Sequence, residues 1–277
     1  MPIFPNAGLL EYLGLHLVIA LLISAAGFFR VYYFVSLGYA FSIATMAAVT
    51  PWLLWAGTDV WTLLQCAALL AYGLRLGAFL IHRERSPVYR KEMVDVVERG
   101  KKIRGIVKLA IWISVSLLYV LMFSPALFAL LARRTTPGGG TLASQFPGLA
   151  LMAAGLLLEA WSDHQKSAFK ARQPGQFCNM GLYRLVRCPN YLGEIIFWIG
   201  GWIAGISSYS HWAHWAMSLS GLVCIVLVML GSTRRLERKQ EERYGRDPAY
   251  RKYAASVPIL FLFLPVYSFR NLRVCLG

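Results

Sequence analysis

Long apolar segments, separated by short polar stretches, make up most of this chain. A helix needs about 20 mostly apolar residues to cross a bilayer, so each long segment is a candidate span. Seven candidates follow one another along the sequence: 8–29, 31–55, 60–81, 105–131, 147–160 with a polar extension, 192–207 and 211–230. A further apolar stretch, 258–265, is too short to span and should be re-entrant, interfacial or packed against the bundle. The pattern predicts an all-α polytopic membrane protein with seven transmembrane helices.

The composition favours the same class of protein. Hydrophobic residues make up 57% of the chain and charged residues 15%, whereas soluble domains are about 45–50% apolar and about 25% charged. Five Cys and five His residues show neither a CxxC motif nor the mixed Cys/His spacing of a metal site. We therefore expect no metal and no structural disulfide.

The net charge of +15 is concentrated in three polar regions, namely the loop 83–104, the passage 166–187 and the tail from residue 234 onward. The loops after the second and sixth apolar segments contain no Lys or Arg. Because cytoplasmic loops are rich in Lys and Arg, the seven-helix pattern predicts an external N-terminus and a cytoplasmic C-terminus. The same count places Arg133 and Arg134 on the external side of the membrane, and these two residues are the exception to the pattern. This distribution favours membrane orientation and contact with anionic lipid over nucleic-acid binding.

Ionisable side chains recur at helical spacing in the stretch 159–198. Glu159 and Asp163 lie four residues apart and share a helix face, and Asn190 and Glu194 form a second such pair. Ionisable groups in or beside a membrane segment are costly and usually functional, so the stretch is a candidate site. The arginines of the segment YRLVR can converge with Asn190 on an anion, at the start of the next helix. A phosphate-bearing cofactor fits this arrangement well, and a lipid headgroup fits it less specifically.

A tyrosine and an arginine share a face of the third apolar segment, in the sequence AYGLRLGAF. Tyr72 and Arg75 lie three residues apart, at membrane depth. In one interpretation Tyr72 packs as an interfacial aromatic and Arg75 extends its guanidinium to the membrane surface. In the other, the phenol donates a hydrogen bond to a substrate carbonyl while the cation lies alongside.

Three motifs together resemble one family. The central motif, 181–198, reads G-L-Y-R-x-V-R-x-P-N-Y-x-G-E-x-x-x-W; E-x-x-S-D-x-Q-K precedes it, and a charged tail ending in R-x-Y-x-x-x-x-P follows. This pattern resembles the membrane steroid 5α-reductase family, and its bacterial members most closely. The shorter RxPNY element is also similar to sterol C14 and C7 reductases and to isoprenylcysteine carboxyl methyltransferases.

The resemblance implies one domain over 1–277, with substrate-side helices in 1–132 and cofactor-side helices and tail in 146–277. It implies a monomeric NADPH-dependent enzyme of the bacterial inner membrane rather than the endoplasmic reticulum. Hydride would go to C5 of a Δ4-3-ketosteroid, a Tyr would stabilise the enolate, and C4 would take a proton. The family's Y-x-x-R pattern implies catalytic roles for Tyr72 and Arg75. The cofactor-binding residues that the resemblance implies are Asp163, Lys170, Arg172, Arg187, Asn190, Glu194, Trp198, Arg234 and Arg238.

The chain departs from the family at the ketone clamp. Eukaryotic members pair the Tyr with a Glu on an early helix, yet no acidic residue lies between Leu13 and Thr58. The polar candidates that replace it for substrate binding are Tyr33, Ser36 and Tyr39. A changed spacing after Asp163 leaves Lys170 and Arg172 as alternatives for one basic role, and the histidine common in bacterial relatives is Cys188 here.

Two other functions remain open at this point. One is a membrane methyltransferase that uses S-adenosylmethionine, because it shares the RxPNY element and an acidic tail. The other is a sterol or lipid binder without enzymatic activity, against which stands the lack of inverted repeats. The S-D-x-Q-K segment, the Y-x-x-R pattern and the density of cytoplasmic Arg favour the reductase.

Overall fold

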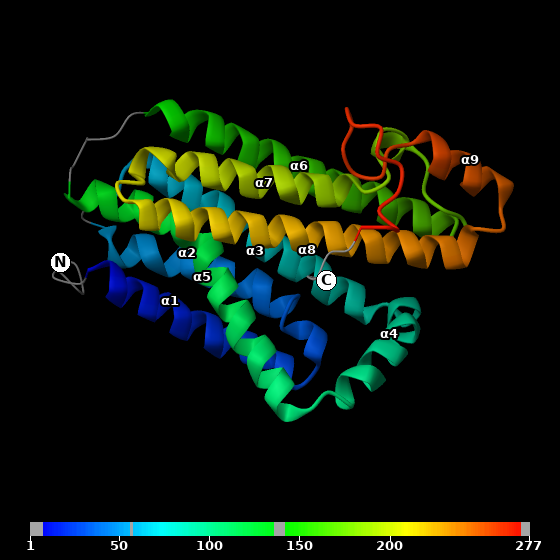
Figure 1. The fold of residues 1–277 in the computed structure, drawn as a ribbon, viewed down its shortest axis with the longest axis horizontal. Helices are drawn as coiled ribbons and strands as arrows, with labels where there is room; N and C mark the ends of the chain where they lie inside the picture. The colour runs from blue at the N-terminus through cyan, green and yellow to red at the C-terminus, as the bar shows by residue number, and fades with distance from the viewer. Residues whose placement is uncertain (1–7, 56–57, 136–141, 273–277) are drawn as a thin grey trace. The chain divides into compact units, whose positions relative to one another are not determined.

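The computed structural model describes residues 8–55, 58–135 and 142–272, and every regular element in these ranges is helical (Figure 1). The predicted all-α class is therefore confirmed. Six helical segments are long and apolar enough to cross a bilayer, and the chain fits an integral multi-pass membrane protein. These segments are Leu9–Phe28, Val31–Leu53, Val60–Arg85, Gly105–Arg134, Ala143–Arg172 and Trp212–Tyr244.

The segment expected at 192–207 forms a shorter helix than the others. Helix α7 covers Pro189–Gly205, which is 17 residues, and the 3₁₀ turn η5, Ile206–Ser208, continues it. Six helices are therefore candidate spans by length and composition, and the predicted count of seven is not confirmed.

The chain divides into two compact units. The first comprises residues 1–149 and 201–221, and the second comprises residues 150–200 and 222–277. Both are discontinuous in sequence because α6, α7 and α8 each contribute residues to both.

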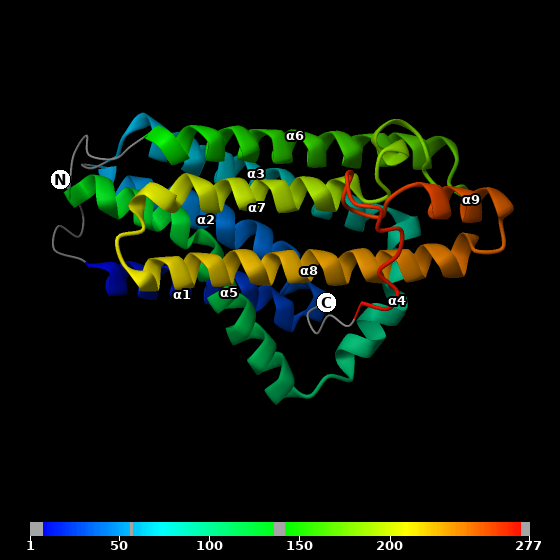
Figure 2. The ribbon, with the colours of Figure 1, turned by 45° about the horizontal axis from the view of Figure 1, so that its top comes forward.

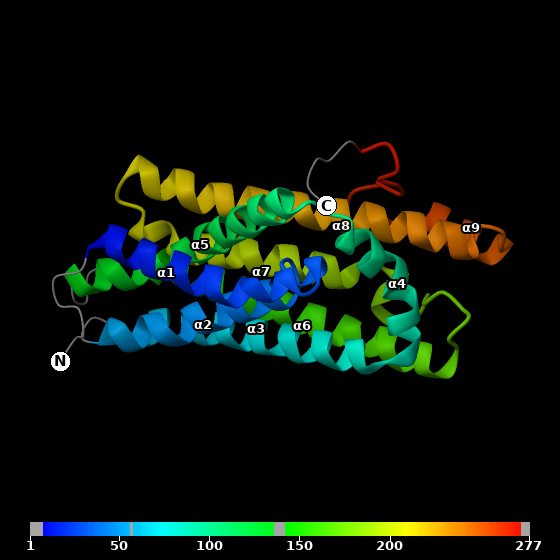
Figure 3. The ribbon, with the colours of Figure 1, turned by 90° about the horizontal axis from the view of Figure 1, so that it is seen from below.

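Four long helices form the first unit: α1 (Leu9–Ser24), α2 (Leu37–Leu53), α3 (Val60–Arg85) and α5 (Gly105–Thr135). Helix α2 packs against α3, and α1 packs against both α2 and α5 (Figure 3). Two 3₁₀ turns, η1 (Ala25–Phe28) and η2 (Val31–Tyr33), connect α1 to α2. Aromatic side chains from these helices, including Phe34, Tyr72 and Phe123, are fully buried.

A separate helix occupies most of the basic loop. Helix α4, Pro87–Lys101, follows α3 after a single residue, Ser86, and leads into α5 (Figures 1 and 2). Ser86 is extended and Pro87 takes the first helical position, where its missing N–H and fixed φ are tolerated. The sequence analysis assigned these residues to a loop, because charged residues in 83–104 hide the apolar positions of a short amphipathic helix.

The opposite end of α3 carries an ion pair between buried Arg133 and partly exposed Asp59. Arg133, near the end of α5, lies 2.9 Å from Asp59 Oδ2 and donates a hydrogen bond of 2.8 Å to Gln145 Oε1. Asp59 also caps α3 by accepting from the N–H of Thr62. Arg133, one of the two basic residues that are exceptions to the predicted topology, is thus paired with a carboxylate.

The second unit combines the middle and end of the chain. Its elements are parts of α6 (Leu142–Arg172), α7 and α8 (Trp212–Tyr244), together with η4 (Gly181–Arg184) and α9 (Pro248–Ser256). Asp247 caps α9 by accepting from the N–H of Ala249 at 2.8 Å.

The apolar stretch 258–265 forms no regular helix. Ile259 and Leu260 are buried, and the N–H of Ile259 donates to the carbonyl of Val266 at 2.9 Å. Phe263, by contrast, is 92% exposed. One part of the stretch therefore packs into the second unit, and the other part presents an apolar tip.

Candidate functional site

Two tyrosine hydroxyls meet inside the first unit. Tyr72 on α3 is fully buried, and its hydroxyl lies 2.8 Å from that of Tyr39 on α2. Either oxygen can be the donor. Buried hydroxyls are nearly always hydrogen-bonded, and this pair places two of them side by side among apolar helices. Tyr39, one of the three residues predicted to bind the substrate, therefore contacts Tyr72, the predicted catalytic tyrosine.

Aromatic packing holds this pair in place. The ring of Tyr39 stacks on Tyr119 of α5, with centroids 5.5 Å apart and an interplanar angle of 27°. The hydroxyl of Tyr119 in turn donates to the carbonyl of Phe34 at 2.5 Å. The Tyr39 and Tyr72 rings meet edge to face at 6.0 Å. Three helices therefore fix the position of the two hydroxyls.

The remaining predicted residues of the first unit have other neighbours. Arg75 is half-buried one turn beyond Tyr72 on α3. Ser36 donates to the carbonyl of Tyr32 at 2.8 Å, and Tyr33 donates to Glu84 Oε2 at 2.6 Å. Glu84 follows Tyr72 by twelve residues on a helix that rises about 1.5 Å per residue. Tyr33 therefore contacts α3 roughly 18 Å along the helix axis from Tyr72.

Close backbone contact between α6 and α7 organises the second unit. A Cβ at Gly155 would lie 2.5 Å from the carbonyl oxygen of Gly193, and a Cβ at Gly193 would lie 2.7 Å from the nitrogen of Glu159. Only glycines permit this approach. It brings together the predicted acidic side chains of both helices, and Glu159, Asp163 and Glu194 are all buried.

Three predicted cofactor residues have buried polar atoms without a hydrogen-bond partner among the described residues. They are Nε of Arg187, Oδ1 of Asn190, at the start of α7, and Nε of Arg234, on α8. Buried polar atoms are usually paired, so an unpaired one needs an explanation. An amide oxygen accepts and a guanidinium donates, and the ribose hydroxyls and phosphates of a dinucleotide would supply the matching groups. These atoms therefore leave one acceptor and two donors available to a polar ligand of this kind.

Arg187 forms a fully buried ion pair with a residue that the sequence analysis did not select. Its Nη2 lies 3.2 Å from Glu237 Oε1, and both side chains are 2% exposed. Arg187 also donates to the carbonyl of Tyr267, and Glu237 accepts from the N–H of Phe269 at 2.9 Å. Arg187 was predicted to bind an anionic cofactor, and in the folded chain Glu237 neutralises its charge.

The other predicted basic residues differ in exposure. Lys170 donates to the hydroxyl of Tyr244 at 2.6 Å and to the carbonyl of Gln176, which attaches the end of α6 to α8. Arg172 and Arg238 are exposed. Of the two alternatives for one basic role, Arg172 is the more accessible to a ligand. Trp198 is buried on α7, with its ring edge to face with Phe197 at 5.4 Å.

Comparison with known proteins places the whole arrangement in a family. Residues 29–257 match the family described as "Protein of unknown function (DUF1295)". The chain belongs to the DUF1295 family. This family is related to steroid 5α-reductase-like proteins. No curated protein and no solved structure matches the chain. The DUF1295 match begins after α1 and ends after α9, so it includes Tyr39, Tyr72 and the α6–α7 cluster.

Gln165 of the S-D-x-Q-K motif organises the connection between α6 and α7 in this DUF1295 chain. Its Oε1 accepts from the N–H of Leu182 at 3.0 Å. The preceding residue, Gly181, has φ +58°. A second hydrogen bond attaches this connection to α9, because the hydroxyl of Tyr253 donates to the carbonyl of Tyr183 at 2.6 Å. This part of the motif is therefore structural.

Cys188 stands where bacterial relatives of the reductases have a histidine. Burial raises the pKa of its thiol to about 11, although the nearby Lys166 ammonium acts in the opposite direction. The thiol is therefore neutral at pH 7, and its side chain cannot take the place of a histidine that titrates near neutral pH.

Replacing Gly181 by Ala should destabilise this DUF1295 chain by at least about 1–2 kcal/mol, the cost of left-handed backbone in a residue with a Cβ. The new Cβ would also lie 2.5 Å from Gln165 Oε1. The measurement is thermal unfolding in detergent. Gly175→Ala is the matched control, because no atom lies within 4 Å of its added Cβ. Equal melting temperatures for the two variants would contradict the prediction.

Proposed function

We propose that this chain is an NADPH-dependent membrane reductase that acts on the Δ4 double bond of 3-oxo-steroids. The observation that carries the proposal is the buried hydroxyl pair of Tyr39 and Tyr72, with Tyr72 in the Y-x-x-R sequence of α3. Membership in a family related to steroid 5α-reductase-like proteins supports it.

The two tyrosines replace the Glu–Tyr clamp implied by the resemblance. Tyr39 can donate its proton to the oxygen of Tyr72, and Tyr72 would then donate to the 3-keto oxygen when the substrate binds. A phenol with a pKa near 10 remains a donor at neutral pH. As C5 is reduced, negative charge grows on that oxygen, and a donor placed in a dry cavity stabilises it by about 3–4 kcal/mol. The enolate then takes a proton at C4 from water, and the addition of hydride and proton across the double bond is complete.

The second unit would hold the cofactor. NADPH, when bound, supplies the hydride for C5. Asn190 Oδ1 would accept from a cofactor hydroxyl or amide, and Arg234 would donate to a phosphate. Arg172 and Arg238 are exposed and can pair with phosphate oxygens, for which arginine is well suited. Buried Asp163 and Glu194 would accept from ribose hydroxyls.

The membrane topology that accompanies this function has seven crossings, an external N-terminus and a cytoplasmic C-terminus. Helix α7 and η5 together approach the length that a span needs. Within the first unit, the basic helix α4 lies at the end of α3 that this topology assigns to the cytoplasm, which agrees with the positive-inside pattern. Arg133, at the other end of α3, departs from that pattern and is paired with Asp59. The resemblance to bacterial reductases favours the bacterial inner membrane, and we expect a monomer.

Thermal unfolding of the detergent-solubilised chain with NADPH, NADH or S-adenosylmethionine tests the proposal. A ligand at 100 times its Kd should stabilise the fold by about 2.7 kcal/mol. We expect NADPH to raise the melting temperature most. Stabilisation by S-adenosylmethionine alone would overturn the reductase and favour methyl transfer.

Two adjacent arginines of α8 provide a matched comparison for the cofactor site. Arg234→Gln should lose most of the NADPH-dependent stabilisation, because Arg234 Nε is buried and unpaired among the described residues. Arg235→Gln should keep it, because Arg235 is exposed and bonded to Ser232 at 3.0 Å. Both changes remove one positive charge, so a general charge effect would lower the stabilisation equally in the two variants.

A further inference from the structure

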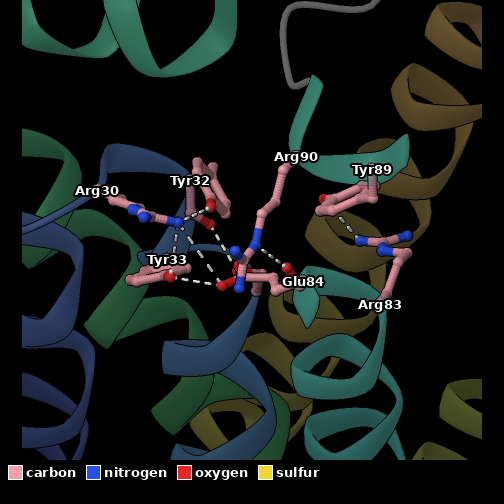
Figure 4. Close-up of polar contacts among 8 residues, drawn as sticks. Arg30, Tyr32, Tyr33, Arg83, Glu84, Tyr89 and Arg90 are labelled. Carbon is pink, nitrogen blue, oxygen red and sulfur yellow. Dashed lines mark hydrogen bonds and ion pairs between the residues drawn. The ribbon is translucent and has the colours of Figure 1, made fainter. Parts of the chain in front are cut away.

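A cleft lies at the end of α3 in the first unit, between η2 and α4. It has two adjoining compartments with volumes of about 250 Å³ and 410 Å³. Arg30, Glu84 and Arg90 line both compartments, so the two adjoin along these residues. Figure 4 shows the three side chains close to one another at the end of α3. None of these residues has a role in the proposed reduction.

One compartment is strongly basic. Its lining contains three arginines, Arg30, Arg85 and Arg90, and one acidic residue, Glu84. Glu84 is already engaged, because it accepts from Tyr33 at 2.6 Å and lies 3.8 Å from Arg30. Three guanidinium groups facing one committed carboxylate leave a net positive charge that suits a phosphate group.

Two of the three arginines, Arg30 and Arg90, are held in position by contacts within the chain. Arg30 donates to the hydroxyl of Tyr32 at 3.0 Å and to that of Tyr33 at 3.2 Å. Arg90 donates from Nε to the backbone carbonyl of Glu84 at 3.0 Å, and its side chain reaches across from α4 (Figure 4). Because the Nε of Arg90 is occupied in this way, its terminal amino groups remain to bind an anion.

The other compartment is largely apolar. Met93, Val94 and Val97 of α4 line it beside the rings of Tyr32 and Tyr89. Glu98 also lines it, and its carboxylate is paired with Lys101 at 2.7 Å. Arg83 fixes Tyr89, because its Nη2 donates to the tyrosine hydroxyl at 3.2 Å and its guanidinium lies 4.5 Å from the ring centroid. An apolar wall next to a group of arginines matches an amphiphile that carries a phosphate.

The cleft lies where two spans meet the membrane surface. The span Val31–Leu53 begins there, and the span Val60–Arg85 ends there. Tyrosines and arginines are enriched at this level of a bilayer, and basic pockets on the cytoplasmic side bind anionic lipid headgroups. We propose that this cleft binds the phosphodiester headgroup of an anionic phospholipid, with the first methylenes of an acyl chain against Met93, Val94 and Val97.

Native mass spectrometry of the full-length chain in detergent, titrated with phosphatidylglycerol or phosphatidylcholine, tests this site. We expect phosphatidylglycerol to bind more tightly than phosphatidylcholine. The double variant Arg30→Gln/Arg90→Gln should bind phosphatidylglycerol at least about tenfold more weakly, which corresponds to 1.4 kcal/mol. Equal binding of the two lipids by the unmodified chain would overturn the proposal.

The variant Arg99→Gln/Lys102→Gln is the matched control. It removes the same charge from exposed positions at the end of α4 that do not line the cleft. We expect its affinity for phosphatidylglycerol to be unchanged. An equal loss of affinity in both double variants would show a general effect of charge and would overturn the site.

Competition separates lipid from soluble phosphate. Inorganic phosphate, glycerol 3-phosphate and NADPH are each added to the lipid-bound chain. We expect none to displace phosphatidylglycerol at millimolar concentration, because none has an acyl chain to contact the apolar compartment. Displacement would overturn the lipid assignment in favour of a soluble phosphate. The result is independent of the proposed reduction, since the NADPH-dependent thermal shift should survive in the Arg30/Arg90 variant.

Discussion

Replacing Tyr72 by Phe is expected to lower reduction of a Δ4-3-ketosteroid by about 10²–10³-fold, the usual effect of removing one oxyanion donor. The ring stays, so packing inside the first unit is kept, and only the hydroxyl beside Tyr39 is lost. The measurement is NADPH oxidation by the purified variant with a steroid enone. NADPH-dependent thermal stabilisation should be unchanged, which separates loss of chemistry from loss of cofactor binding.

Tyr39→Phe is the comparison that assigns the roles. The change removes the Tyr39 hydroxyl and keeps the Tyr72 hydroxyl that donates to the ketone. Activity should therefore fall only about three- to tenfold, the effect of losing a hydrogen bond worth about 1 kcal/mol. Full activity of Tyr72→Phe would end the proposed mechanism. A larger loss in Tyr39→Phe than in Tyr72→Phe would make Tyr39 the group that contacts the ketone.

The second large effect is expected at the buried pair of Arg187 and Glu237. Glu237→Gln should destabilise the chain by about 3–5 kcal/mol, because it leaves the Arg187 charge buried without a carboxylate. The loss is measured as a fall in thermal or denaturant-induced unfolding stability in detergent. Glu241→Gln is the matched control one turn further along α8. Its partner, Arg270, is half-exposed, so the cost should stay below about 1 kcal/mol.

A double replacement distinguishes the ion pair from general packing. Arg187→Met with Glu237→Leu removes both charges together, and such exchanges are often neutral or stabilising. We expect the double variant to be more stable than Glu237→Gln alone, despite the lost acceptor for the N–H of Phe269. If both were equally unstable, the charge of Arg187 would not be the cause.

Hydropathy alone predicted the all-helical membrane fold, because a lipid-exposed span must satisfy its backbone internally and shows this as a long apolar run. It did not predict α4, whose apolar face is short and interrupted by charges. It also predicted a crossing at 192–207. The α-helix there ends at Gly205, and this crossing is not confirmed. Local pattern cannot show whether a 3₁₀ turn such as η5 extends a short helix far enough.

The sequence predicted some residues of the site and missed others, because local pattern does not show contacts between segments distant in sequence. Tyr72 and Tyr39 could be selected because polar groups are conspicuous in apolar segments, and the structure joins them. Glu237 was passed over because it lies among many charges in the tail, where an acid is usually solvated. Its burial depends on the carbonyl of Tyr267 and the N–H of Phe269 folding back onto α8, a contact distant in sequence. Its position among Arg234, Arg235, Arg238 and Lys239 was the available signal.

The pairing of Asp59 with Arg133 bears on how the chain is made. Asp59 precedes Arg133 in the sequence, so the carboxylate is synthesised before the arginine that it neutralises. An arginine at the end of an apolar helix is costly without a counterion, and here the counterion is already part of the growing chain when α5 is made. The order of the two residues therefore lets α5 pack with its terminal charge neutralised as soon as it meets α3.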